Sequence, residues 1–261
     1  MKKIDILKYL PKEKEYELAE GFSPIEVYEI FKRNGWNSLF HANTVATTKT
    51  FLDQKGLLSR KYVEDRGLFQ TAQHTDDLDK KFKIWDLIFL DGKDLSQRFR
   101  RPNYYGPILF QFDTEILLSD EIKSIRITRC NPCHWQNNEY VHRHCYTSLE
   151  EFEKNYSSND GETVGGIMLM LETSEGRIDI TEHLKMLTAY LPSDTITMMY
   201  KNENLPVRKV VSKYLKPSFD SLGVTTKCIR NNSWARSYDR MFHDNPDDFK
   251  RFFLANDESE S

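Results

Sequence analysis

The hydrophobic residues of this chain fall in short runs separated by polar turns. The clearest run, Ile-Leu-Phe-Gln-Phe at residues 108–112, has the length and composition of a buried central strand. Similar runs predict further strands at residues 124–129, 166–171, 194–200 and 224–229. Apolar residues at helical spacing predict helices at residues 148–155, 180–191, 205–215 and 233–254. Strands and helices do not alternate regularly, which predicts an α+β fold: a single domain with a mixed β-sheet, split into two packed halves, and peripheral helices.

The two ends of the chain differ from this central part. Residues 1–36 are polar with a helical pattern, and within them Ser23-Pro24-Ile25-Glu26 has the form of a capping box with proline at the first helical position. This segment is predicted to be a helical N-terminal preface. The domain itself is expected to span residues 37–254, and residues 255–261 are expected to form an acidic, disordered tail.

Composition limits the classes of protein to which the chain can belong. No apolar run approaches the roughly 20 residues that cross a membrane, and the N-terminal segment becomes charged too early for a signal peptide. We therefore expect a cytoplasmic protein without a membrane partner. The formal net charge of −3 argues against indiscriminate binding of polyanions but allows a local basic groove. Four cysteines in such a chain do not indicate a disulfide framework.

Residues 39–60, LFHANTVATTKTFLDQKGLLSR, place a histidine at the end of a predicted strand. An apolar pair precedes His41, and small and hydroxyl residues follow it. A helical segment then leads to Gly56, where a C-cap glycine belongs, and a second apolar segment ends at Arg60. The pattern is strand, polar turn, helix, glycine stop and a second short apolar segment.

The next segment combines a polar loop with buried residues. Residues 70–77 have neither helical nor strand periodicity, and loops of this length in compact domains often cover a substrate site. The apolar residues between positions 82 and 90 must be buried, and Asp91-Gly92 is a turn signal. Residues 102–107 then lead the chain into the predicted central strand.

Taken in order, these segments resemble the ADP-ribosyltransferase fold, in which a strand-end histidine faces NAD. The resemblance rests on His41, on Gly-Leu-Leu-Ser-Arg at residues 56–60, on Tyr105-Gly106 and on Glu162 ahead of a strand. It is closest to DNA-modifying toxins and more distant to poly-ADP-ribose polymerases and tRNA 2′-phosphotransferases. Pro107 stands where the polymerases have a glycine-rich extension, so the resemblance implies transfer of a single ADP-ribose. It also implies NAD as co-substrate, and an antitoxin partner or a role in phage defence.

The resemblance implies a role for each site residue. Cleavage of the ribose–nicotinamide bond develops positive charge on the ribose, so the site needs a carboxylate, a clamp for the carboxamide and groups for the diphosphate. Glu162 is the candidate carboxylate, with Glu172 and Glu139 as alternatives. Arg60 is expected to bind phosphates. The remaining NAD-binding candidates are His41, Ala42, Asn43 and Thr44 around the ribose and carboxamide, and Tyr105 or Tyr104 for stacking on the nicotinamide ring.

A Cys/His cluster at residues 130–145 offers different chemistry. Cys130 and Cys133 have C-x-x-C spacing, and His142 and Cys145 follow, so these four residues could hold a structural zinc ion. The two halves are close together, however, and His-x-His-Cys is not a standard ligand pattern. An ordinary loop with buried thiols is the favoured interpretation. A catalytic deaminase zinc site is disfavoured, because Pro132 lies inside the cysteine pair.

Three arginines interleaved with aromatic residues, Arg98, Arg100 and Arg101, precede the tyrosine pair. This mixture suits the binding of phosphates and the stacking of unpaired bases, so DNA or RNA is the predicted acceptor. The sequence thus predicts an NAD-dependent mono-ADP-ribosyltransferase that modifies a nucleic-acid base or another intracellular acceptor. Two alternatives stay open: an NAD glycohydrolase, and a zinc-stabilised nucleic-acid-binding protein without catalysis.

Overall fold

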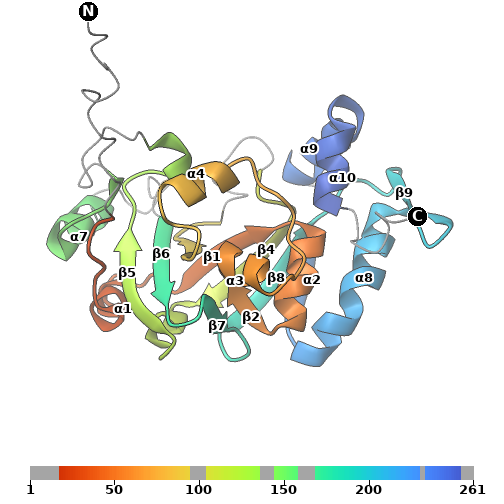
Figure 1. The fold of residues 1–261 in the computed structure, drawn as a ribbon. Helices are drawn as coiled ribbons and strands as arrows, with labels where there is room; N and C mark the ends of the chain where they lie inside the picture. The colour runs from red at the N-terminus through yellow and green to blue at the C-terminus, as the bar shows by residue number, and fades with distance from the viewer. Residues whose placement is uncertain (1–17, 95–103, 136–143, 158–167, 230–232, 254–261) are drawn as a thin grey trace, which may run out of the picture.

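The computed structural model describes residues 18–94, 104–135, 144–157, 168–229 and 233–253. A seven-stranded sheet with the order β11-β8-β4-β1-β3-β6-β5 forms its centre (Figure 1). Neighbouring strands are antiparallel except for β11 and β8, which are parallel, so the predicted α+β fold with a mixed sheet is confirmed. The strands are β1 (Ser38–Asn43), β3 (Ile88–Asp91), β4 (Ile108–Asp113), β5 (Ile122–Ile127), β6 (Met168–Thr173), β8 (Leu184–Tyr190) and β11 (Thr225–Ile229).

The sheet is nearly divided between β1 and β3. Strand β1 pairs with β4 along six residues, from Ser38 to Asn43, whereas it pairs with β3 only through Phe40 and Asp91. Strand β3 in turn pairs with β6 along its full length. One half-sheet therefore contains β11, β8, β4 and β1, and the other contains β3, β6 and β5, but the two remain joined in one sheet rather than forming two separate sheets packed on each other.

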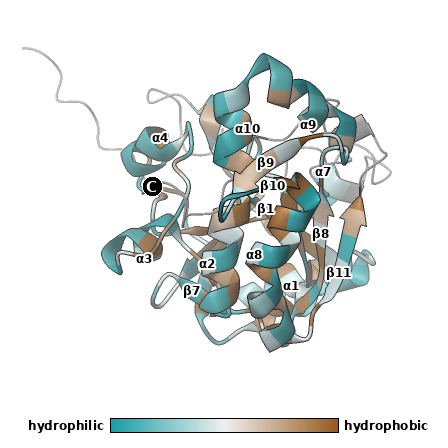
Figure 2. Cartoon of the chain, turned by 90° about the vertical axis from the view of Figure 1, so that its right-hand side faces the viewer, coloured by the Kyte–Doolittle hydropathy of each residue, from teal (hydrophilic) through white to brown (hydrophobic). Residues whose placement is uncertain are grey.

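Helices pack around this sheet, and two small two-stranded sheets accompany it. Figure 1 shows α1 and α7 beside β5 and α4 above the middle of the sheet, and Figure 2 shows α2 and α8 side by side, in agreement with their contacts. The helices are α1 (Pro24–Arg33), α2 (Val45–Asp53), α3 (Arg60–Asp65), α4 (Asp76–Lys81), α7 (Leu149–Ser157), α8 (Val207–Leu222), α9 (Ser233–Asp244) and α10 (Pro246–Phe253), with 3₁₀ turns η2 (Thr114–Leu118) and η3 (Pro132–His134). The small sheets pair β2 (Gly56–Leu58) with β7 (Arg177–Asp179) and β9 (Thr197–Tyr200) with β10 (Glu203–Pro206).

The hydrophobic core includes the central strand β4 and reaches the helices α1 and α7. Phe110 and Phe112 of β4 are fully buried with ring centroids 6.0 Å apart. A second aromatic group, Phe31, Phe152 and Tyr156, packs α1 against α7. Burial of such side chains contributes about 1.5–3 kcal/mol each and fixes the strands that carry the cavity described below.

Two predicted helices are wrong. Residues 184–190 form strand β8, because the hydrogen bonds that β8 makes to β4 on one side and to β11 on the other outweigh the helical spacing of its apolar residues. The helix predicted over residues 233–254 is two helices that meet at Asn245, where Pro246 begins α10. The proline ring cannot continue the preceding helix but fits the first position of a new one.

Local details of the N-terminal half also differ from prediction. Between residues 18 and 36, only 24–33 are helical, and Phe22 forms a β-bridge with Ile125. Proline begins α1 as predicted, but Ser23 makes no side-chain capping bond. Gly56 lies in β2 rather than capping α2, and the left-handed turn residue is Lys55 (φ 47°).

Within the described part of the chain, no helix is long and apolar enough to span a bilayer. The predicted tail at 255–261 lies outside the described residues.

Candidate active site

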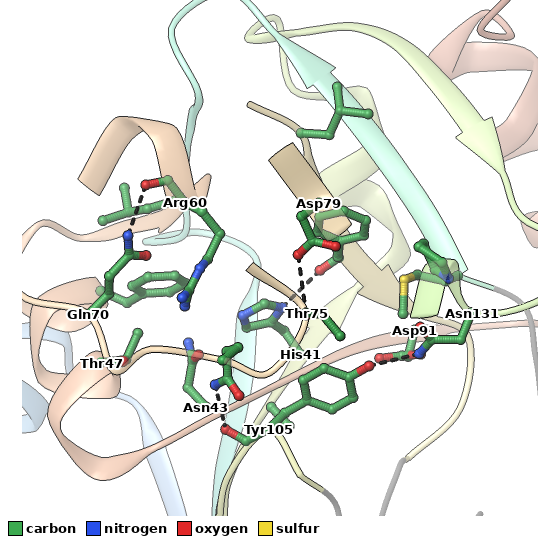
Figure 3. Close-up of a pocket in the computed structure, with 18 residues that line it drawn as sticks. His41, Asn43, Thr47, Arg60, Gln70, Thr75, Asp79, Asp91, Tyr105 and Asn131 are labelled. Carbon is green, nitrogen blue, oxygen red and sulfur yellow. Dashed lines mark hydrogen bonds between the residues drawn. The ribbon is translucent and has the colours of Figure 1, made fainter. Parts of the chain in front are cut away.

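A cavity opens where β1 and β3 part (Figure 3). Its volume is about 100 Å³, well above the roughly 10–15 Å³ that a cavity needs to hold one water molecule, so it can admit a group larger than water. The lining residues come from both half-sheets, α2, α3, α4 and the loops between them. They include His41, Ala42, Asn43, Thr47, Arg60, Gln70, Gln73, Asp79, Phe89, Asp91, Tyr105, Asn131 and Met168.

His41 joins the two half-sheets beyond the last backbone pair. Its Nδ1–H donates to the Phe89 carbonyl at 2.8 Å, which leaves the lone pair on Nε2 for another partner. Its ring stacks on Phe51 at 5.6 Å. Burial lowers the pKa of His41 to about 4, and the charge of Arg60 lowers it further, whereas the hydrogen bond to the Phe89 carbonyl and, more weakly, one with the Asn43 side chain oppose the shift. The imidazole is therefore neutral at neutral pH, with Nε2 as a hydrogen-bond acceptor.

Asn43, at the end of β1, and Gly106, in the segment that leads into β4, lie against each other. Gly106 has φ +143°, and a Cβ on it would lie 2.2 Å from the carbonyl carbon and oxygen of Asn43. Only glycine allows this approach, which places Tyr105 against the end of β1. The Asn43 side chain lines the cavity with 6% exposure, and its Nδ2 has no hydrogen-bond partner among the described residues.

Tyr105 is the tyrosine that lines the cavity, whereas Tyr104 is 48% exposed and contacts α10 through its carbonyl group. The Tyr105 hydroxyl oxygen accepts a hydrogen bond of 2.7 Å from Asn131 Nδ2. Burial raises the pKa of the phenol, and the charges of Asp91 and Asp79 raise it further. Tyr105 is therefore a neutral, fixed aromatic wall.

Arg60 faces the cavity from the first turn of α3. Its Nη2 donates to both carboxylate oxygens of Asp76 at 2.6 Å, and its Nη1 donates to the Thr71 carbonyl at 3.1 Å. The guanidinium also lies over the Trp85 ring, 5.3 Å from its centroid. The buried Nε has no hydrogen-bond partner in the described part of the chain. Arg60 thus keeps donor capacity at the cavity although Asp76 balances its charge.

Thr44 is not among the residues that line the cavity; its role is structural. It is fully buried at the N-cap of α2, where its Oγ1 accepts from the Thr47 amide, and it also bonds Thr71 Oγ1 at 2.7 Å. The Thr71 amide donates to Thr47 Oγ1 at 2.9 Å. These hydroxyl groups hold the predicted loop at 70–77 against α2, so the loop borders the cavity as expected.

Asp79, on α4, adds a carboxyl group that the sequence did not indicate. Its Oδ2 accepts from Thr75 Oγ1 at 3.4 Å, and Figure 3 shows it above His41. Burial raises the pKa of Asp79 to about 7, and the charge of Asp76 acts in the same direction, whereas Arg60 and Thr75 lower it. This carboxyl group changes its charge near neutral pH.

The three candidate glutamates are not among the lining residues described. Glu162 and Glu139 lie outside the described residues. Glu172 accepts from Arg126 Nη1 at 2.8 Å and from Ser124 Oγ at 2.9 Å, which lowers its pKa. It lies four residues along β6 from the lining residue Met168, a separation of about 13 Å, and its contacts are those of a partly exposed ion pair.

The described part of the Cys/His segment holds Tyr105 in place through Asn131. In the described part of the chain, no group of three or more potential ligand side chains could hold a metal, and His142 lies outside it. Asn131 caps η3 through its Oδ1 while its Nδ2 holds Tyr105. His144 is buried against the Trp135 ring at 4.7 Å, and burial raises the pKa of Cys145 to about 12.

The structure brings His41, Asn43, Arg60 and Tyr105 together around one cavity. Arg98, Arg100 and Arg101 lie outside the described residues. Asp79, Asp91 and Asn131 also line the cavity, although the sequence did not predict this role for them. Asp91 was assigned only to a turn and Asn131 only to the cysteine loop, and no local signal distinguishes the carboxyl group of Asp79 from its acidic neighbours.

No protein-family model matches the chain, and no curated protein matches it significantly. Three solved structures of DarT from Thermus sp. 2.9 are similar to it. The complex with ADP-ribosylated ssDNA has a TM-score of 0.46 and 9% identity over 76% of this chain and 95% of that chain. The complexes with NAD⁺ and carba-NAD⁺ have TM-scores of 0.42 and 0.44, identities of 9% and 11%, and coverage of 76% of this chain and 96% and 97% of theirs. At these identities the matches assign no residue of the cavity.

Proposed function

We propose that this protein is a mono-ADP-ribosyltransferase that transfers ADP-ribose from NAD to an intracellular acceptor, a nucleic-acid base. One observation carries the proposal: His41, Arg60 and Tyr105 lie far apart in the sequence but line one cavity where the sheet parts. These are the residue types that nicotinamide, ribose and diphosphate require, in the order expected from the resemblance.

The cavity residues suit the parts of NAD. The nicotinamide ring fits beside Tyr105, and the buried Nδ2 of Asn43 supplies a donor for the carboxamide oxygen. The Nε2 lone pair of neutral His41 accepts from a ribose hydroxyl. Arg60 lies on the opposite side of the cavity from Tyr105 (Figure 3), where its guanidinium reaches a phosphate.

The proposed reaction breaks the bond between ribose C1′ and the pyridinium nitrogen. The bonding electrons remain on nicotinamide, which leaves as a neutral molecule, and positive charge develops on the ribose. A nucleophilic atom of the acceptor then forms a bond to C1′ and loses its proton. Glu162 is the proposed group for stabilising the ribosyl cation or accepting this proton.

The acceptor and the biological role are also part of the proposal. Arg98, Arg100 and Arg101 lie four to seven residues before Tyr105 in the chain, so an acceptor strand bound by them would approach the nicotinamide end of the cavity. An enzyme that modifies DNA or RNA in the cytoplasm would act as a toxin or in phage defence, and an antitoxin protein would restrain it.

One assay tests this function against its alternatives. The protein is incubated with NAD labelled in the adenine ring, together with single-stranded DNA, RNA or cell protein. Label on a macromolecule supports transfer, free labelled ADP-ribose indicates NAD hydrolysis, and unchanged NAD contradicts both. Glu162→Gln should abolish transfer and Glu172→Gln should not. Transfer at the parent rate by Glu162→Gln would show that the glutamate assignment is wrong.

A further inference from the structure

We propose that Asp79 is the residue through which the cavity distinguishes a positively charged nicotinamide ring from a neutral one. This inference rests on the proposed function and extends it to substrate specificity. Oxidised NAD carries a cationic pyridinium ring, whereas reduced NAD and the released nicotinamide carry neutral rings. Asp79 would favour the oxidised substrate and let the product leave.

The polar groups of the cavity lie on different sides of it. Arg60 lies on one side, and Asp91, Tyr105 and Asn131 lie on the other, with His41 between them (Figure 3). Asp79 projects from α4 above His41, and both Asp79 and Asp91 act electrostatically on the Tyr105 hydroxyl. A ring stacked on Tyr105 would therefore lie within the field of two carboxyl groups. An aromatic face also attracts a cation.

Asn43 gives an independent indication of the ligand. Its side chain is 94% buried, lines the cavity and carries an Nδ2 group without a hydrogen-bond partner among the described residues. A buried donor without a partner costs about 1–3 kcal/mol, which an acceptor on a bound ring would recover. A flat ring, a carbonyl oxygen and a positive charge are the three features matched by Tyr105, Asn43 and Asp79.

The charge of Asp79 depends on the groups that face it. Burial and, after it, the charge of Asp76 on the same helix raise the pKa of Asp79 to about 7, whereas Arg60 of α3 and the hydrogen bond from Thr75 lower it. Two groups of the sheet share the cavity with Asp79: the neutral His41 and the carboxyl group of Asp91. The 3₁₀ turn η3, which packs on α4, carries the exposed His134. With a pKa near 7, the carboxyl group is about one-tenth ionised at pH 6 and nine-tenths ionised at pH 8.

The test uses two rings of nearly the same shape and requires no catalysis. The dissociation constants of 1-methylnicotinamide, a cation, and of nicotinamide, which is neutral, are measured with the full chain by calorimetry at pH 6 and pH 8. We expect the affinity for the cation to rise about tenfold between these pH values and the affinity for nicotinamide to stay constant. Asp79→Asn should remove the rise, whereas Asp77→Asn, which changes an exposed neighbour on α4, should retain it.

The outcomes separate this inference from the proposed function. A tenfold rise that Asp79→Asn abolishes supports the inference even if NAD is never consumed, in which case only the transferase proposal fails. A flat cation affinity in the parent protein, a rise that persists in Asp79→Asn, or no binding of either ring overturns the inference, even if ADP-ribose transfer is observed. In an active enzyme, Asp79→Asn should raise the KM for NAD at pH 8 more than it lowers kcat. Thermal unfolding of each variant confirms that the fold is intact.

Discussion

The close approach of Gly106 to the end of β1 gives the sharpest prediction about the site. In a Gly106→Ala variant, the new Cβ would lie 2.2 Å from the carbonyl group of Asn43 and 2.3 Å from the Thr44 nitrogen. Real Cβ atoms essentially never approach other heavy atoms within 3.0 Å. Both obstructing groups belong to the backbone, so the two segments must separate by roughly 1 Å, and the residue must also keep φ +143°.

This displacement should affect catalysis more than stability. Tyr105 moves with residue 106, and a misplacement of about 1 Å can cost about 100-fold in rate. Backbone strain adds about 1–3 kcal/mol to the free energy cost of folding. We therefore expect the rate of ADP-ribose transfer to fall about 100-fold while the protein remains folded, as measured with labelled NAD and by denaturant unfolding.

Gly67→Ala is the matched control for this substitution. Gly67 also has a positive φ, +61°, but a Cβ on it meets nothing within 4 Å. It should therefore lose stability from strain and keep its transfer rate. If Gly106→Ala transfers ADP-ribose within threefold of the Gly67→Ala rate, the close approach of Gly106 does not position Tyr105 for the reaction.

Three further predictions concern charged groups. Arg60→Lys replaces the planar fork that binds Asp76 and Thr71, so the KM for NAD in steady-state assays should rise about tenfold. Because the pKa of Asp79 is raised to about 7 in the folded state, ionising this carboxyl group above that pH costs folding free energy that the unfolded state, with a pKa of about 4, does not lose. Asp79→Asn removes this cost, so it should increase the free energy of unfolding at pH 8 by up to about 4 kcal/mol and much less at pH 4, as measured with urea. Glu172→Gln breaks a partly exposed pair with Arg126 and should change the free energy of unfolding by about 1 kcal/mol or less, without affecting transfer.

Sequence patterns predicted the centre of the sheet because its strands are short, buried and apolar. The run at residues 108–112 could be assigned directly, since β4 is paired on both sides. The segment at 184–190 could not, because Leu184, Leu187 and Leu191 have a spacing that also suits a helix, and only the neighbouring strands β4 and β11 decide between the two.

The site residues also fall into two groups: those that local sequence signals mark and those that tertiary contacts alone bring to the cavity. Arg60 begins α3 and Tyr105 precedes β4, at places that local turn signals mark in the sequence, whereas His41 lies inside β1, two residues before the strand ends. Their chemical roles stay predictions. Asp79 and Asn131 acquire their importance only from tertiary contacts, one from burial beside Asp76 and the other from its bond to Tyr105. No periodicity along the chain encodes such contacts.

The single backbone pair between Phe40 and Asp91 has a mechanical consequence. His41 and Tyr105 belong to one half of the sheet or its loops, whereas Asp91 and Met168 belong to the other, and all four border the same cavity. A ligand bound between them would link the two half-sheets where the fewest backbone hydrogen bonds join them. Binding should therefore make the two halves unfold as one unit and slow amide hydrogen exchange on both β1 and β3, including at positions that the ligand does not touch.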